Sequence, residues 1–222
     1  SLFVNVNEHF NLLEKQFTFE QDLICRVYKS LVSAFYDHLP QPIIFDKFRG
    51  WMRHVEGVRQ FINPLPRIVC TVRPIAEIIT SYIVLADKDP NNFIDADLRR
   101  RKLPVDNEAR AYLLWTEYLS IPYEMLKYGI AHNKQNLLII GYDDIIRNPF
   151  RVLDKVYSFC GIDPFCHSFS AIENRCAEND DGWGLKNLHA IRPVLASTSV
   201  SPKSLLPASC VDWLTQFDVR AA

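Results

Sequence analysis

Apolar residues along the chain follow two patterns, and each pattern predicts a different kind of element. Consecutive apolar and β-branched residues are typical of short buried strands, and three such runs cover residues 43–45, 68–72 and 137–140. Apolar residues that recur every three or four positions are typical of one face of a helix. This spacing predicts helices over 8–38 (as two helices or one broken helix), in a stretch ending near 61, and over 75–85, 108–131 and 149–159.

Strands that alternate with helices predict an α/β fold in which helices cover both faces of a parallel sheet. Three strands are few for a sheet of this class, so we expect a first strand and the loop after it to precede Ser1. The polar stretch 87–106 is predicted to be a long surface loop or lid. We expect one domain over residues 1–222, with a helical N-terminal segment (1–41), an α/β core (42–162) and an irregular C-terminal segment (163–222).

Composition and charge exclude several classes of function. The formal net charge is −1, so the chain lacks the basic excess of a protein whose main partner is a nucleic acid. No apolar run approaches the roughly 20 residues that span a bilayer, and the first residues do not resemble a signal peptide. The six cysteines are scattered and form no cluster at zinc spacing, so we expect a reducing compartment and no metal. These features predict a cytoplasmic protein, or a lumenal one if a targeting segment precedes Ser1.

The junction after the second predicted strand carries a candidate anion site. Arg73 ends the strand, Pro74 suits the first position of the next helix, and Ser81 follows eight residues after Arg73. A guanidinium offers a planar fork of donors and a hydroxyl adds one more, which suits a phosphate monoester at the carboxyl edge of the sheet. The alternative is an arginine at a strand end and a serine that faces solvent.

Two further strand ends and the tail also carry candidate residues. Lys47 follows the first predicted strand and is a candidate to stabilise charge in a transferring group, or else an exposed strand-end charge. Tyr142 follows the third and is a candidate to stack on a purine, while an aspartate after it caps a helix. The tail carries three further candidates, Lys186, His189 and Arg192. They would wrap a polyanion, or else they lie in an exposed structural loop.

Together these motifs resemble those of the sulfotransferases that use 3'-phosphoadenosine 5'-phosphosulfate (PAPS). In that family an Arg…Ser pair eight residues apart holds the 3'-phosphate of the nucleotide, which implies this role for Arg73 and Ser81. The family's pattern Tyr-Glu-Asp-Leu…Pro…Phe-Leu-Gly-Ile, whose tyrosine lies near the adenine, is similar to residues 142–162. Residues 45–49 are similar to the tyrosylprotein-sulfotransferase branch, where a lysine placed like Lys47 stabilises the transferring sulfuryl group.

The resemblance implies a three-layer, P-loop NTPase-like fold of sulfotransferase type and the transfer of a sulfuryl group from PAPS to a hydroxyl or amine. The product nucleotide would be 3'-phosphoadenosine 5'-phosphate, and no metal would take part. Lys47 is then the expected catalytic charge, His54 or His189 a candidate base, and residues 186–192 a loop that closes over the nucleotide. Two alternatives stay open, namely a nucleotide-dependent kinase of related fold and a degenerate module that binds a nucleotide without turnover.

Overall fold

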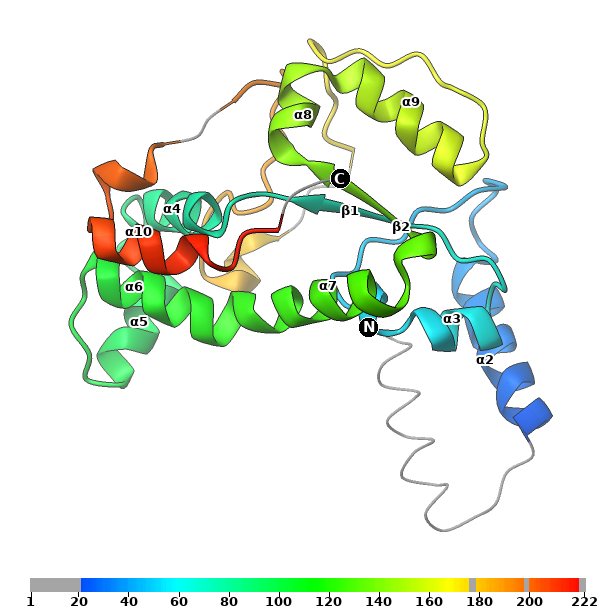
Figure 1. Cartoon of the computed structure of the whole chain (residues 1–222), viewed down its shortest axis with the longest axis horizontal. Coiled ribbons are helices and arrows are strands. Elements are labelled where there is room, and N and C mark those ends of the chain that lie inside the picture. The colour runs from blue at the N-terminus through cyan, green and yellow to red at the C-terminus, as the bar shows by residue number, and fades with distance from the viewer. Residues whose placement is uncertain (1–20, 176–178, 198–199, 220–222) are drawn as a thin grey trace. The chain divides into compact units, whose positions relative to one another are not determined.

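The chain folds into two compact units, and each unit is built from two stretches of sequence. The computed structural model describes residues 21–175, 179–197 and 200–219 (Figure 1). One unit contains the residues up to Ile68 and the stretch 125–137, and the other contains residues 69–124 and those from Leu138 onward. The predicted helical segment over residues 8–20 lies outside the described residues. The predicted division of one domain at residues 41 and 162 stays a prediction.

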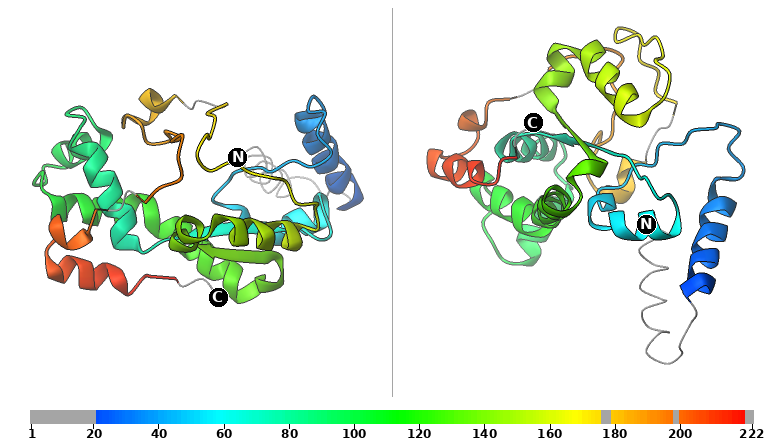
Figure 2. Two further views of the ribbon diagram at one scale, coloured as in Figure 1. Left: turned by 90° about the horizontal axis from the view of Figure 1, so that it is seen from above. Right: turned by 45° about the vertical axis from the view of Figure 1, so that its right-hand side comes forward.

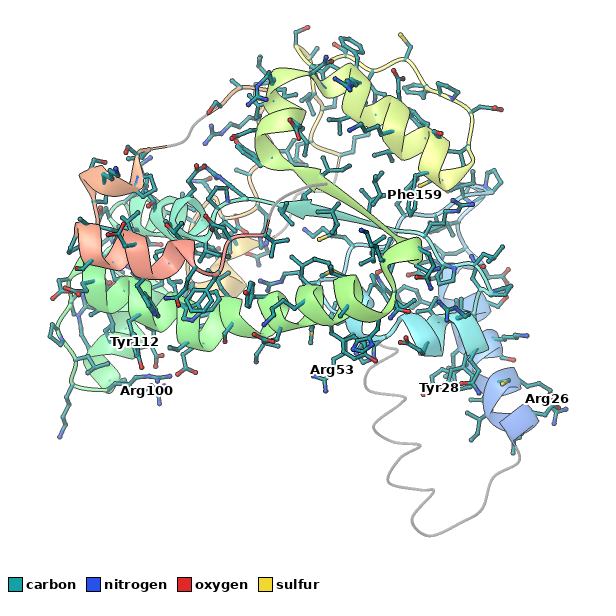
Figure 3. The ribbon with its side chains drawn as sticks, in the orientation of Figure 1. Arg26, Tyr28, Arg53, Arg100, Tyr112 and Phe159 are labelled. Carbon is teal, nitrogen blue, oxygen red and sulfur yellow. The ribbon has the colours of Figure 1, made fainter. Side chains whose placement is uncertain are left out.

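The first unit is helical where it is described. The rings of Tyr28 and Phe61 stack with their centroids 4.6 Å apart, and Ile24 packs with them in a small core. Figure 3 labels Tyr28 on its helix. The predicted helices are confirmed in this part of the chain, and the elements are α2 (Gln21–Tyr36), η1 (Trp51–Arg53) and α3 (Val55–Phe61).

The predicted strand over residues 43–45 is wrong. These residues form no strand, and the side chains of Ile43, Ile44 and Phe45 are 49%, 40% and 65% exposed. Pro40 and Pro42 precede the run, and proline removes the N–H groups that a strand ladder needs. A run of three apolar residues after two prolines is therefore a poor strand, even though its composition is that of one.

The other two predicted strands are confirmed and form a small parallel sheet. β1 (Ile68–Val72) pairs with β2 (Leu137–Gly141), and both run in the same direction in Figure 1. Each is half-buried rather than buried, with Val72 and Ile140 the most covered residues. β2 leads directly into a helix and β1 does so after Arg73 and Pro74, which places the two strand–helix junctions at the same edge of the sheet. The fold is thus mixed α/β, and the larger three-layer sheet stays a prediction.

The second unit contains the main hydrophobic core. Helix α4 (Ile75–Ala86) contributes Ile79 and Ile83, both fully buried, and packs against α6 (Asn107–Leu113) and α10 (Ala208–Thr215) (Figure 2). The rings of Trp115 and Phe217 stack at 4.0 Å between centroids, which ties the end of the described chain to this core. The helix that begins after β1 is therefore packed along its length and offers a rigid base for the residues at its start.

The polar stretch 87–106 is not one long loop, because it contains α5 (Phe93–Arg100). Asn92 caps this helix by accepting a hydrogen bond from the backbone N–H of Asp95, and Ile94 and Leu98 are fully buried. A cap residue followed by two apolar positions was enough to form a short helix in a charged stretch.

The helices predicted over 108–131 and 149–159 are confirmed, and the structure adds shorter elements. The helix predicted over 108–131 is confirmed as a continuous series, α6, η2 (Leu114–Leu119) and α7 (Ser120–His132), in which η2 is a π-helical stretch. Gly161, with φ of +67°, ends α9 in the left-handed conformation that glycine adopts without strain. The other described elements are η3 (Lys134–Asn136), α8 (Tyr142–Arg147), α9 (Pro149–Cys160), η4 (Asp180–Trp183) and η5 (Pro202–Ser204).

Candidate functional site

Arg73 and Tyr142 meet at the carboxyl edge of the sheet. Arg73 is the first residue after β1 and Tyr142 the first after β2, so parallel pairing of the strands brings them side by side. The guanidinium carbon of Arg73 lies 4.4 Å from the centroid of the Tyr142 ring. A cation over a tyrosine face is attracted by the ring quadrupole, by about 0.5–2 kcal/mol depending on exposure. Two residues that the sequence placed at one edge are thus in direct contact.

Glu77 is a second partner of Arg73. The Nε–H of Arg73 donates to Oε2 of Glu77 over 2.9 Å, and the two side chains are only 17% and 24% exposed. Glu77 stands in the first turn of α4, four residues after Arg73. The arginine is therefore fixed through its Nε and through one face of its guanidinium.

Ser81 lies one turn further along α4 than Glu77. Residues four apart share a helix face, so Ser81 follows Glu77 on the side that faces the Arg73 ion pair. Its side chain is exposed, and its hydroxyl donates to the backbone oxygen of Ile78 at 2.6 Å. The hydroxyl keeps its acceptor capacity, and it can donate to a ligand only by leaving the Ile78 oxygen.

The beginning of α4 is capped from the far end of the chain. Oδ1 of Asp218 accepts a hydrogen bond from the backbone N–H of Ile75 at 2.8 Å, across 143 residues of sequence. Pro74, the residue before the helix, makes no side-chain cap of its own. Asp218 therefore takes the place of a local N-cap and puts a negative charge at the positive end of the helix dipole.

His189 is held by an aspartate within the tail. Its Nδ1 lies 2.7 Å from Oδ1 of Asp180, and its backbone N–H donates to Oδ2 of the same carboxylate at 3.1 Å. Burial acts to raise the pKa of Asp180, but the bonds from His189 outweigh it and the pKa is lowered. Leu185 anchors this loop in the core, whereas Lys186 and Arg192 are exposed.

Lys47 and His54 belong to the first unit. Lys47 is exposed, and the residue before it, Asp46, accepts hydrogen bonds from Tyr36 and, over 2.9 Å, from Nε1 of Trp51. His54 is half-buried between η1 and α3, and burial together with the neighbouring charge of Arg53 lowers its pKa. The structure thus gives Lys47 an anchored neighbour and leaves the imidazole of His54 neutral at neutral pH.

The family of the chain follows from a family comparison. A model described as the sulfotransferase family matches residues 6–165, which is more than half of the chain. The chain belongs to the sulfotransferase family. No curated protein and no solved structure gives a match. The matched residues include β1, the Arg73 junction, β2 and Tyr142. The contact between Arg73 and Tyr142 therefore lies within the residues that match the sulfotransferase family.

The matched range of the sulfotransferase family ends before the tail candidates Lys186, His189 and Arg192, and their roles stay predictions. In the described ranges, no helix of the protein is long and apolar enough to cross a membrane. The sulfotransferase family generally uses PAPS as its donor.

Three residues of the candidate site were not found from the sequence. Glu77 had a usable signal, because an acid four residues after an arginine on a helix start forms an ion pair. Asp180 and Asp218 had none, since nothing in the local sequence ties them to His189 or to Ile75.

Proposed function

We propose that this chain binds PAPS and transfers its sulfuryl group to a hydroxyl or amine. The observation that carries the proposal is the contact of Arg73 with Tyr142 at the carboxyl edge of the β1–β2 sheet. A cation for a phosphate and an aromatic ring for a purine stand together there, inside the range that matches the sulfotransferase family. Membership of that family supports the donor, because its members generally use PAPS.

Arg73, Ser81 and Tyr142 are proposed to bind the adenosine 3'-phosphate end of the donor. The Nη groups of Arg73 supply paired donors for a phosphate, and charge-assisted pairs of this kind are the strongest hydrogen bonds in proteins. The Ser81 hydroxyl supplies one more donor once it leaves the Ile78 oxygen. The half-buried Tyr142 ring supplies an apolar face for the adenine.

Lys47 and His54 are proposed as the catalytic residues. PAPS supplies a sulfuryl group attached to a stable leaving nucleotide. Lys47 compensates negative charge on the leaving phosphate, a role that rests on the similarity of residues 45–49 to the tyrosylprotein-sulfotransferase branch. His54 takes the proton of the acceptor, since an imidazole with a lowered pKa is neutral and ready to accept a proton at neutral pH.

The tail is proposed to contribute further charge to the nucleotide site. Lys186 and Arg192 are exposed cations on the loop that Leu185 anchors, and His189 is oriented by Asp180. A polyanionic nucleotide would be attracted by these groups, and His189 is a second candidate for the base.

Binding of 3'-phosphoadenosine 5'-phosphate tests the proposal directly. At a concentration about 100-fold above Kd, a ligand that binds only the folded state stabilises it by about 2.7 kcal/mol, so the melting temperature should rise. Arg73→Ala should weaken binding by roughly 10- to 100-fold, because hydrogen bonds to a charged group contribute about 1.5–3 kcal/mol. Arg151→Ala, an exposed arginine on α9, is the matched control and should bind like the wild type.

Transfer of labelled sulfate from PAPS to a panel of hydroxyl and amine acceptors tests the chemical step. Lys47→Ala should retain nucleotide binding and lose most of the transfer rate. Binding without transfer to any acceptor would favour the non-catalytic module, and the absence of binding would overturn the proposal.

A further inference from the structure

The side chain of Arg73 is fixed at two points before any ligand is present. Its Nε–H is bonded to Glu77, and its guanidinium lies over the ring of Tyr142. Neither of these partners occupies the terminal nitrogens, Nη1 and Nη2. Arginine carries five N–H donors in a rigid fork, so four of them remain, and one from each terminal nitrogen points along the outer edge.

That outer edge has no protein partner in the part of the chain that the structure describes. Over residues 21–175, 179–197 and 200–219, the Arg73 side chain forms no hydrogen bond or ion pair other than that with Glu77. Such an edge presents two parallel N–H groups, which match the oxygen spacing of a phosphate. The Nε bond and the Tyr142 stack therefore leave available the pair of nitrogens that a bidentate phosphate contact uses.

We propose that Glu77 is a positioning residue for Arg73 and thereby determines affinity for a nucleotide that carries a 3'-phosphate. The inference rests on the proposed function, since it takes Arg73 as the phosphate ligand. Glu77 would not contact the nucleotide, because its carboxylate repels a phosphate. It holds the guanidinium in one orientation, and the Tyr142 ring prevents rotation about the remaining axis.

Positioning has a physical basis in the entropy of the arginine. A mobile arginine loses rotamer freedom when it binds a ligand, and fixing it beforehand removes that cost from binding. The low exposure of both side chains, 17% and 24%, keeps their bond from exchanging readily with water. The opposite possibility is that the Glu77 charge competes with the phosphate, and the two possibilities predict opposite effects of removing the carboxylate.

The experiment measures the Kd of two nucleotides for wild type, Glu77→Ala and Glu77→Gln by calorimetry. The nucleotides are 3'-phosphoadenosine 5'-phosphate and adenosine 5'-phosphate, which differ only in the 3'-phosphate. Glu77→Ala should weaken binding of the first by about tenfold and leave the second within about twofold. Glu77→Gln keeps an oxygen acceptor for the Nε–H and should retain at least the wild-type affinity.

Two controls separate positioning from general damage. Asp22→Ala removes another acid–arginine pair four residues apart, with Arg26 on α2, and should change neither Kd. The Nε–H resonance of Arg73 should be protected from exchange in wild type and Glu77→Gln, and should lose that protection in Glu77→Ala. A merely structural role for Glu77 would weaken both nucleotides together.

The outcomes distinguish this inference from the proposed function. Tighter or unchanged binding of the 3'-phosphorylated nucleotide by Glu77→Ala would overturn the positioning role while Arg73 remained the ligand. Combined with Arg73→Ala, Glu77→Ala should have no further effect, because its influence acts through the arginine. If Arg73→Ala binds both nucleotides like wild type, the proposed phosphate site itself is wrong.

Discussion

Several candidate site residues of this protein lie beside residues that hold them or their neighbours in place. Arg73 is fixed by Glu77 and Tyr142, His189 by Asp180, and the segment before Lys47 by the bonds of Asp46. Arg73 and His189 each have a second residue beside them that orients the side chain, whereas Lys47 follows a residue whose own side chain is held. Substitutions of these partners therefore test positioning separately from the loss of the functional group.

The hydrogen bond between Tyr36 and Asp46 affects the pH at which Tyr36 loses its proton. Burial, together with the hydrogen bond to Asp46 and its charge, raises the pKa of Tyr36 from its ordinary value of 10.0 to about 12. The folded pKa lies above the unfolded one, so the contribution to stability is complete below pH 10 and is lost as the pH rises towards 12. Asp46→Asn should lower the pKa of Tyr36, as measured by tyrosinate absorbance against a Tyr36→Phe reference. An unchanged titration would show that the bond is absent in solution.

At the scale of elements, the two strand–helix junctions define the candidate site. β1 and β2 are neighbours, and each ends one residue before a candidate site residue, Arg73 or Tyr142. Because parallel pairing fixes the register of both strands, a shift of either helix start would separate the two side chains. The pairing of β1 with β2 thus sets the distance between Arg73 and Tyr142.

The short helix α5 depends on its capping residue. Asn92 is fully buried, accepts from the N–H of Asp95, and donates to the backbone oxygens of Ala86 and Asp89. Asn92→Ala removes the cap and two side-chain hydrogen bonds to backbone carbonyl groups, each of which keeps a backbone N–H partner, so the free energy of unfolding should fall by about 2 kcal/mol. Asn148→Ala, at the exposed cap of α9, is the matched control and should cost about 1 kcal/mol in a urea titration. Equal losses in the two variants would contradict the buried network.

The sequence predicted those elements whose signal is local. The runs 68–72 and 137–140 carry enough β-branched residues to specify strands. Their carboxyl ends placed Arg73 and Tyr142 at the same edge of the sheet, where the two side chains are in contact. The run at residues 43–45 has the same composition, but the prolines before it lack the backbone N–H groups that a strand ladder needs. The apolar composition of the run does not reveal this loss. Helix α5 was missed because one cap and a few apolar residues are a weak signal within a charged stretch.

At the scale of the whole second unit, a buried ion pair links α5 to α6. Asp95 accepts from both Nε and Nη2 of Arg110, at 2.7 and 2.8 Å, and the two residues are 5% and 9% exposed. The hydrogen bond from Arg110 holds the pKa of Asp95 below its usual value. Figure 3 labels Arg100 on α5 and Tyr112 on α6.

Breaking that pair from one side should be costly. Arg110→Met leaves the Asp95 carboxylate buried without its cation, so the free energy of unfolding should fall by about 3–5 kcal/mol. Asp95→Leu combined with Arg110→Met removes both charges and should lose less than the single variant. Thermal unfolding at neutral pH measures both, and a double variant less stable than the single one would contradict the expectation.

The capping of α4 by Asp218 predicts a further effect on stability. Asp218→Ala should lower the free energy of unfolding by about 1 kcal/mol, which for a chain of this size lowers the melting temperature by about 2–4 °C. Asp218→Asn keeps an oxygen that caps a helix and should lose much less. Asp212→Ala, an exposed acid on α10, serves as the control. A loss in Asp212→Ala equal to that in Asp218→Ala would show that the cap contributes nothing.

The long sequence separation of the Asp218 cap has a consequence for the order of folding. Contacts between distant residues close large loops, and their entropy makes them late steps. During synthesis the Arg73 junction leaves the ribosome when residues up to 218 have still to be made, so the start of α4 remains uncapped for most of that time. Nascent chains stalled before α10 should therefore contain the strand sequences and yet fail to retain a 3'-phosphorylated nucleotide. Asp218, which follows α10, would complete a corner whose other parts were made first.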